Sequence, residues 1–238
     1  MNIGNQIATC ARVLCLALPL VILGCGGKGD DLQPLDKGLV WRYAVIHQVG
    51  ENTRRSVLEE RSLGRLPGAE EPVYGVAQHD GSVDVLARAD DGVRRVGIAN
   101  AAGTITPLSP PEWVVPSAGV DVWTIATTTG VIERRVEDFE EAGFRLPVAV
   151  TIEYRRTGEG RRVEVPAGTF EGCTEFTGRG VREVVRNRLG QLTRVTVEQT
   201  DSYCPGMGLV LRERREFTDN PIILNGSYRR VLTQLRRL

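Results

Sequence analysis

Side chains that usually carry catalysis are few in this 238-residue chain. Only two histidines are present, His47 and His79, and neither belongs to an H-E-x-x-H or comparable zinc-binding pattern. No Gly-x-Ser-x-Gly sequence supplies the turn on which a lipase-type serine nucleophile sits. We therefore predict no catalytic residue, no metal site and no cofactor, and we expect a protein that is not an enzyme.

Adjacent carboxylates are the remaining residues that could do hydrolytic chemistry. Pairs of adjacent glutamates that could serve this chemistry occur at Glu59-Glu60, Glu70-Glu71 and Glu140-Glu141. Hydrolysis of a glycosidic bond needs two carboxylates at a set distance across the substrate, and adjacency in sequence does not establish that distance. A carboxylate-dependent hydrolase is therefore the least favoured function.

The first residues have the pattern of an export signal. A polar stretch with one cation, Arg12, precedes the apolar run Val13–Leu23, and Gly24 and Cys25 follow. This run is roughly half of the ~20 apolar residues that a membrane-spanning helix needs. We therefore expect residues 1–24 to be a signal peptide that is removed from the mature chain.

The end of this segment, Ile22-Leu23-Gly24-Cys25, resembles the lipobox of bacterial lipoproteins. The resemblance implies that diacylglycerol is attached to the Cys25 thiol, and that Cys25 becomes the first mature residue with its amine usually acylated, for example by palmitate. Leu23 departs from the small residue often found two positions before the cysteine. An ordinary signal peptide or an uncleaved anchor, with Cys25 a spare thiol, is the alternative. Two or more acyl chains would hold the protein at a membrane, since each buried CH₂ contributes roughly 0.8 kcal/mol.

Residues 25–33 are rich in glycine and predict a flexible tether from Cys25 to a folded domain at residues 34–238. In lipoproteins of bacteria with two membranes, an aspartate directly after the lipidated cysteine favours retention at the inner membrane. This chain has Gly26 at that place. The resemblance therefore implies an outer-membrane anchor facing the periplasm if the organism has two membranes.

The cysteine positions fit the same compartment. Cys10 and Cys15 fall in the signal and Cys25 is the expected lipid site, which leaves Cys173 and Cys204 in the folded part. Exported proteins meet an oxidising environment in which a pair of thiols tends to form a disulfide. We expect a Cys173–Cys204 disulfide, with two free buried thiols as the alternative.

Composition bears on the partners. The chain has 30 Lys+Arg and 30 Asp+Glu, so its formal net charge is zero. Nucleic-acid affinity comes largely from cations that neutralise phosphates, and the 5% aromatic content leaves few rings for base stacking. We therefore expect no nucleic-acid partner, and we expect contact with a membrane through the lipid on Cys25.

The folded part has the pattern of antiparallel strands joined by turns. Apolar and polar residues alternate along Pro147–Tyr154, where Val148, Val150, Ile152 and Tyr154 form one face. Further strand candidates are bounded by turn residues: Leu39–Val49, Val73–His79, Val83–Ala89, Val93–Ala99, Val120–Thr128, Val163–Val165, Cys173–Arg186, Thr193–Thr200, Gly208–Phe217 and Ser227–Leu235. We predict a single all-β domain of about ten antiparallel strands, as a curved sheet or open half-barrel, with a β-sandwich as the alternative.

At most one short helix is expected, over residues 131–143. Ile132, Val136 and Phe139 recur at helical spacing, and Gly143 could end the helix. The same residues could instead form a hairpin strand after Gly130, and the sequence favours neither.

Arginine pairs bear on the shape of the sheet. Only two of the 30 Lys+Arg residues are lysines, and pairs such as Arg94-Arg95, Arg214-Arg215 and Arg229-Arg230 recur. Adjacent strand residues point to opposite faces, so a tight core would have to bury one arginine of each pair, which is costly unless a carboxylate partners it. We expect the pairs at strand ends, or on a sheet whose two faces are partly wet. Nearby acidic residues could be partners: Glu133, Glu137, Glu213 and Glu216.

Two turn motifs carry a second resemblance. Together with Pro34–Gly38, Trp41 and Tyr43, the stretches Val165–Cys173 and Tyr203–Val210 resemble uncharacterised secreted bacterial proteins and lipoproteins with V-P-A-G-x-F and Y-x-x-G-x-G-L-V turns. The resemblance implies an antiparallel curved sheet, related in style to periplasmic half-barrels, with no established reaction. The cysteine after Tyr203 departs from that pattern, which fits a disulfide special to this branch.

The residues of these motifs have a simple conformational role. Gly168, Gly206 and Gly208 provide backbone angles that other residues resist, and Pro166 and Pro205 stiffen the turns. We interpret them as structural turns, with a ligand-contacting rim as the alternative.

These observations favour a non-enzymatic envelope lipoprotein that binds a partner protein or has a structural role. The alternative is a carrier or sensor of a lipid or other apolar ligand. That function requires a continuous apolar cavity on the concave face, near the alternating apolar residues of Pro147–Tyr154.

Overall fold

The computed structural model describes residues 31–68, 70–117, 119–130, 132–134, 144–145, 147–185 and 192–238. The expected lipid site Cys25 lies outside the described residues, and so does most of segment 131–143. The three described residues of that segment include a short strand, β8 (Glu133–Arg134). In the described part of the chain every regular element is a β-strand, and no helix is long and apolar enough to cross a membrane.

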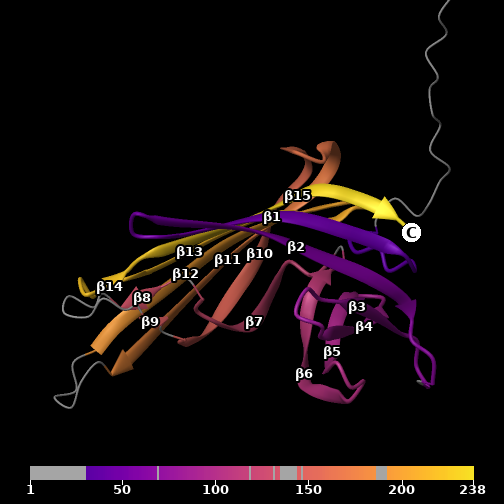
Figure 1. Cartoon of the computed structure of the whole chain (residues 1–238), viewed down its shortest axis with the longest axis horizontal. Coiled ribbons are helices and arrows are strands. Elements are labelled where there is room, and N and C mark those ends of the chain that lie inside the picture. The colour runs from indigo at the N-terminus through magenta and orange to yellow at the C-terminus, as the bar shows by residue number, and fades with distance from the viewer. Residues whose placement is uncertain are drawn as a thin grey trace, which may run out of the picture.

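Twelve strands form one antiparallel sheet that is nearly closed into a barrel (Figure 1). They are β1 (Leu39–Val49), β2 (Asn52–Arg65), β3 (Val73–Ala77), β4 (Val83–Ala89), β5 (Gly92–Ala99), β6 (Ile105–Pro116), β7 (Val122–Thr128), β10 (Ala149–Val165), β11 (Gly168–Val185), β12 (Leu192–Cys204), β13 (Gly208–Thr218) and β15 (Gly226–Arg237). Their spatial order is β6-β5-β4-β3-β2-β1-β15-β13-β12-β11-β10-β7. The first strand therefore pairs with the last, and β6 and β7 are left as the two edges.

A small three-stranded sheet lies at one end of the large one (Figure 1). It consists of β14 (Ile223–Leu224), β8 and β9 (Phe144–Arg145), in that order. Ile132, just before β8, is fully buried, and Ile223 packs beside it against the interior apolar residues. Ile223 of the small sheet and the neighbouring Ile132 therefore contribute apolar side chains to the interior.

The large sheet buries alternate residues, as the sequence pattern predicts. Along β10, Val150, Ile152 and Tyr154 are buried, and the intervening residues are exposed. They join Phe176 and Val197 in a first apolar cluster inside the sheet. Burying one face of each strand in this way is the main favourable term that orders the sheet.

The two sheet edges are held from the interior by side chains. The Tyr203 hydroxyl on β12 donates to the carbonyl oxygen of Val114 on β6, at 3.2 Å. The Arg214 guanidinium on β13 donates to the carbonyl oxygen of Thr128 on β7, at 2.9 Å. Side chains thus satisfy part of the backbone hydrogen bonding that a direct β6–β7 ladder would provide in a fully closed barrel.

The all-β antiparallel prediction is confirmed, but its strand count and shape need correction. The large sheet has twelve strands rather than about ten, and it is nearly closed rather than a half-barrel or a sandwich. Strand β2 escaped prediction because its first half is exposed and charged, without apolar alternation. Strand β6 was missed because of Pro107, Pro110 and Pro111. An edge strand tolerates proline, because one of its sides has no ladder hydrogen bond to lose.

The two turn motifs meet in a second apolar cluster, which also contains Trp41 and Tyr43. The predicted disulfide between Cys173 and Cys204 is present there and joins β11 to β12. The Trp41 indole Nε1–H donates to the carbonyl oxygen of Met207 in the β12–β13 turn, at 2.7 Å. This hydrogen bond joins the second motif, Tyr203–Val210, to strand β1.

Both glycines of the β12–β13 turn need their conformational freedom. Gly206 and Gly208 have φ of 72° and 83°, in the left-handed region that favours glycine. The Gly206 N–H also donates to the carbonyl oxygen of Asp31, at 2.8 Å. Asp31 in turn pairs with Arg88 at 3.1 Å, so the described end of the expected tether, residues 31–33, contacts the fold.

Candidate binding cavity inside the sheet

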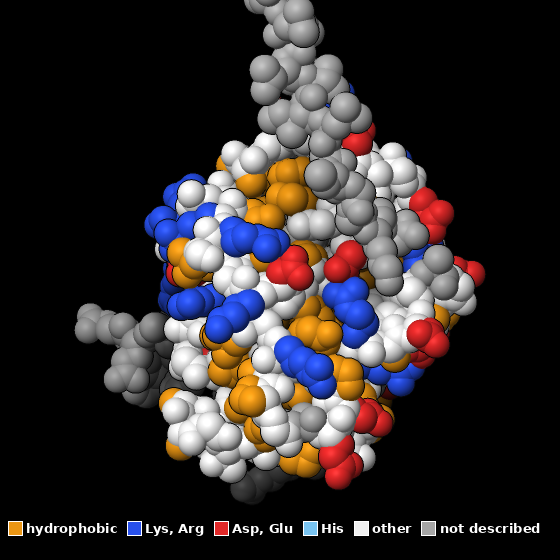
Figure 2. Space-filling view, turned by 90° about the vertical axis from the view of Figure 1, so that its right-hand side faces the viewer, with side chains coloured by type: hydrophobic (Ala, Val, Ile, Leu, Met, Phe, Trp, Pro, Cys, Tyr) orange, Lys and Arg blue, Asp and Glu red, His pale blue; other side chains and the backbone are white. Residues whose placement is uncertain are grey.

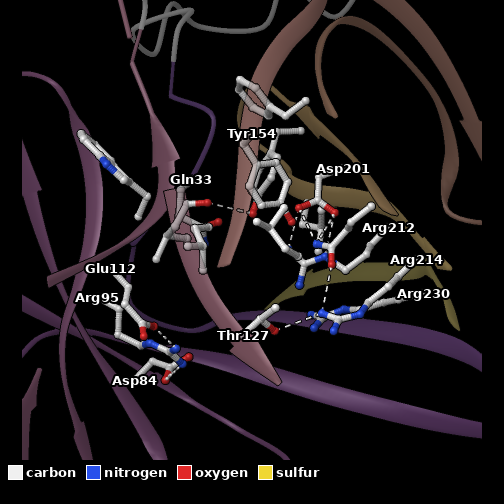
Figure 3. A pocket seen from close by; sticks show the side chains of 18 of the residues that line it. Gln33, Asp84, Arg95, Glu112, Thr127, Tyr154, Asp201, Arg212, Arg214 and Arg230 are labelled. Atoms are coloured by element: carbon white, nitrogen blue, oxygen red, sulfur yellow. Dashed lines mark hydrogen bonds and ion pairs between the residues drawn. The ribbon is translucent and has the colours of Figure 1, made fainter. Parts of the chain in front are cut away.

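A cavity of 370 Å³ lies on the inner side of the large sheet (Figure 3). Pockets for small molecules usually measure about 300–1,000 Å³. Its lining includes four arginines and four carboxylates: Arg95, Arg212, Arg214, Arg230, Glu60, Asp84, Glu112 and Asp201. Part of the interior of the sheet is therefore a cavity lined by charged side chains, rather than a packed apolar core.

The first charged group belongs to β4, β5 and β6. Arg95 donates to Asp84 at 3.1 Å and also pairs with Glu112. The Gln78 amide donates to the second Asp84 oxygen at 2.9 Å. Burial raises the pKa of Asp84 above its ordinary value of 3.8, and the Arg95 cation offsets only part of that effect.

The second charged group lies on β12 and β13. The Arg212 guanidinium binds both oxygens of Asp201, at 2.7 and 2.8 Å, in the bidentate geometry that favours this pairing. The Gln199 amide donates to the same two oxygens, at 3.1 and 3.0 Å. Burial lowers the pKa of Arg212, but the adjacent carboxylate raises it more, so the group stays charged.

Arg214 connects β13 to the edge strand β7. Its Nε donates to Glu216 at 2.7 Å, and its Nη1 donates to the Thr127 hydroxyl at 3.1 Å. The Glu216 carboxylate is 1% exposed and also accepts from the backbone N–H of Gly130, at 2.9 Å. A fully buried carboxylate thus has both a cation and a backbone donor as partners.

Arg230 connects β15 to β2 and β1. It pairs with Glu60 at 2.7 Å, and its guanidinium lies 3.7 Å from the centre of the Tyr43 ring. The Tyr43 hydroxyl donates to the carbonyl oxygen of Leu209 at 3.0 Å. Burial raises the pKa of Tyr43 well above its ordinary value, so the hydroxyl remains a neutral donor.

One wall of the cavity is aromatic. The rings of Trp123 and Tyr154 are stacked with centroids 5.3 Å apart, and Phe176 meets Trp123 edge-on at 5.1 Å. Tyr203 continues the series, 5.9 Å from Phe176. The cavity therefore combines a rigid apolar wall with charged groups, as small-molecule sites commonly do.

The structure shows where the arginine pairs lie. One arginine of each of the three pairs named above lines the cavity: Arg95, Arg214 and Arg230. Of the partners expected from the sequence, Glu216 pairs with Arg214, and Glu213 pairs with Arg229 on the outer face at 3.1 Å. The interior is wet enough for one arginine of each pair, and each inward arginine has a carboxylate partner.

Several cavity residues had no local signal in the sequence. Glu60, Glu112 and Asp201 pair with arginines of other strands, and only the strand order brings these partners together. Because side chains alternate along a strand, Arg94 and Arg95 on β5 must point to opposite faces. This alternation is the one local signal that could have predicted an arginine inside the sheet.

The predicted turn residues form no part of this cavity. Its lining omits all five: Pro166, Gly168, Pro205, Gly206 and Gly208. The two histidines do not line it either, and His47 instead packs edge-on against Tyr228, with ring centroids 5.0 Å apart. Among the residues that the structure describes, no cluster of His, Cys, Asp or Glu could hold a metal ion.

The outer surface mixes the two signs of charge. In Figure 2, arginine and lysine side chains are scattered among carboxylates and apolar patches on the face shown. Exposed ion pairs such as Arg229–Glu213 and Arg194–Glu183 contribute to this mixture. Such a surface is locally compensated and does not form a single-sign patch on that face.

No family model matches the chain, and no curated protein matches it. Two solved structures resemble it coarsely. A protein of Parabacteroides distasonis described as a lipoprotein matches with a TM-score of 0.39 and 12% identity, over 88% of this chain and 100% of its own. An exported protein of Bacteroides fragilis described as having a YmcC-like fold matches with a TM-score of 0.39 and 12% identity, over 87% of this chain and 100% of its own.

Proposed function

We propose that the chain is a non-enzymatic, lipid-anchored protein of the bacterial cell envelope that binds a small polar ligand inside its sheet. The lipobox-like sequence Ile22–Cys25 supports an anchor at Cys25, on the outer membrane facing the periplasm if there are two membranes. The disulfide between Cys173 and Cys204 supports an oxidising compartment. The cavity with its four arginines carries the binding role.

Stability alone does not account for this lining. Burying an ion pair costs several kcal/mol per ion in desolvation, and replacing such a pair by packed apolar residues is often neutral or stabilising. Here four arginines and four carboxylates surround a space of 370 Å³. A set of fixed polar groups around an open cavity is the arrangement that orients a bound molecule.

The lining favours a polar ligand over the apolar one that we considered from the sequence. Ile152 and Tyr154 do line the cavity, but Val150 is packed in the first apolar cluster. Charged groups face the same space, and a lipid chain would cover them without replacing their water. The cavity therefore fits a molecule that itself forms hydrogen bonds.

The test is direct detection of ligand with a variant whose cavity is filled. The full-length protein is incubated with a small-molecule extract of bacterial envelopes and analysed by native mass spectrometry. We expect a bound mass for the natural sequence and for Gln48→Trp, because Gln48 lies exposed on β1. Gln78→Trp places an indole in the cavity and should abolish that mass, with circular dichroism to confirm folding. Equal binding by Gln78→Trp would overturn the proposal.

A further inference from the structure

The charged groups of the cavity already have ion-pair partners within the protein. Each of its four arginines contacts a carboxylate: Arg95 with Asp84 and Glu112, Arg212 with Asp201, Arg214 with Glu216, and Arg230 with Glu60. Four of these five carboxylates line the cavity with the arginines, and the fifth, Glu216, is not a lining residue. An ionic ligand would therefore have to separate one of these pairs and leave a charge without its partner, which is costly in a buried site.

Several polar groups of the lining have no hydrogen-bond partner among the described residues, including the Nε of Arg230 and the indole Nε1 of Trp123. Tyr154 lines the cavity and is 3% exposed, and its hydroxyl makes no hydrogen bond with any described residue. Burial raises its pKa, so the hydroxyl stays protonated. Gln33 also lines the cavity, and its side-chain amide makes no hydrogen bond in the described part of the chain. A hydroxyl and an amide each both donate and accept hydrogen bonds.

The backbone around Gln33 is held in place. Its N–H donates to the Asp31 carboxylate at 3.2 Å, and its carbonyl oxygen accepts from Arg88 at 3.0 Å. Tyr154 is likewise held by its stack on Trp123. The backbone of Gln33 and the ring of Tyr154 are thus positioned in advance on the cavity wall, which reduces the entropy lost on binding.

We propose that the cavity binds a neutral polyhydroxylated molecule, a saccharide of one or two rings, with the Tyr154 hydroxyl and the Gln33 amide as its hydrogen-bond partners. This inference rests on the binding function proposed above. Sugar hydroxyls both donate and accept, so they match the two free groups and also reach unused lone pairs of the carboxylates without disturbing an ion pair. The 370 Å³ cavity lies at the small end of ligand sites, which limits the occupant to about this size.

The experiment uses the full-length protein in an N-oxide detergent, because a maltoside would itself offer sugar to the cavity. Isothermal titration is carried out with glucose, galactose, N-acetylglucosamine and maltose, and with glutamate, inorganic phosphate and palmitate for comparison. The indole N–H resonance of Trp123 is followed in parallel by NMR, because that ring stacks on Tyr154.

We expect at least one saccharide to bind and to shift the Trp123 resonance. Tyr154→Phe and Gln33→Leu should each weaken binding about five- to tenfold, the loss that one hydrogen bond gives. Tyr228→Phe is the matched control, because Tyr228 packs on His47 and does not line the cavity. It should leave the affinity unchanged.

Two results would overturn the inference in distinguishable ways. Binding of glutamate, phosphate or palmitate in place of every saccharide would reject the ligand class and keep the binding function. Absence of binding by all probes, with no mass bound from the envelope extract, would reject both. Saccharide binding that neither Tyr154→Phe nor Gln33→Leu weakens would overturn the assignment of the two contacts.

Discussion

At the scale of single residues, neighbouring arginines of one strand differ sharply in environment. The side chain of Arg230 is 10% exposed and pairs with Glu60, whose side chain is 16% exposed. The adjacent Arg229 pairs with Glu213 on the outer face, and both are about half exposed. The same residue type therefore has a largely buried partner in one case and a solvent-screened partner in the other.

We expect Arg230→Met to lower the free energy of unfolding by about 3–5 kcal/mol, because it leaves the Glu60 carboxylate buried without a cation. Arg229→Met should lower it by less than about 1 kcal/mol. Urea denaturation measures both changes. Adding Glu60→Leu to Arg230→Met should recover much of the loss, and similar small effects of all variants would contradict the buried pair.

Three buried tyrosines make the fold sensitive to alkaline pH. Burial raises the pKa of Tyr203 from its ordinary value of 10.0 to about 12, and it raises those of Tyr43 and Tyr154 as well. The unfolded chain loses these protons first, so the stabilisation is complete below about pH 10. The part that comes from Tyr203 is lost as the pH rises through about 12, and the parts from Tyr43 and Tyr154 are lost at higher pH.

Stability should therefore fall by about 1.4 kcal/mol per pH unit for each such tyrosine above about pH 10. Urea denaturation at several pH values measures the slope, and phenolate absorbance shows whether ionisation coincides with unfolding. Tyr203→Phe should reduce the slope by one proton. Free ionisation of all tyrosines in the folded protein near pH 10 would contradict the prediction.

At the scale of elements, the β11–β12 hairpin is joined both by its ladder and by the disulfide. The ladder runs without interruption from Thr174↔Tyr203 to Val185↔Leu192, and Cys173 and Cys204 lie directly beyond its first pair. The disulfide closes a loop with a sequence separation of 31. The disulfide therefore acts mainly by lowering the conformational entropy of the unfolded chain, because the ladder already holds the two strands together in the folded state.

Replacing Cys173 and Cys204 together by alanine should keep the fold and lower the free energy of unfolding by about 3–4 kcal/mol, as expected for a loop of this length. Urea denaturation of the variant and of the natural sequence measures the difference. Thiol titration of the unfolded, unreduced natural protein should find neither cysteine free. Two titratable thiols from these positions would contradict the disulfide.

At the scale of the whole molecule, a nearly closed sheet encloses a charged cavity close to the proposed anchor. Asp31, which pairs with Arg88, follows Cys25 by only six residues. An extended chain spans at most about 3.3–3.6 Å per residue, so Asp31 would lie within about 20 Å of a lipid on Cys25. The fold would therefore lie near the membrane surface.

Cys25→Ser should move the protein from the membrane fraction to the soluble fraction, because it removes the thiol that would carry the lipid. Cell fractionation measures the distribution, and mass spectrometry of the intact natural protein should show added acyl mass. Cys10→Ser is the matched control, because it lies in the segment expected to be removed, and it should change neither result. Membrane association of Cys25→Ser equal to the natural protein would contradict the anchor.

Local patterns of residue type were enough to predict several strands and turns. Alternation along Pro147–Tyr154 predicted a strand with one buried face, and β10 has that face. The disulfide between Cys173 and Cys204, which we expected over two free thiols from the cysteines outside the expected signal segment, is present. Glycine and proline in the two motifs predicted turns, because few other residues adopt those backbone angles.

How the sheet nearly closes and which charged side chains form pairs depend on contacts between distant parts of the chain. The partners Arg230 and Glu60 are far apart in sequence. They come together because β15 lies next to β1 in the sheet, and β1 lies next to β2. Strand β6 tolerates its prolines because it is an edge strand. An edge strand forms ladder hydrogen bonds with a neighbour on one side alone. Periodicity is a local property and register is not, so the sequence predicted strands and turns, whereas the cavity and its ion pairs depended on the order in which those strands pair.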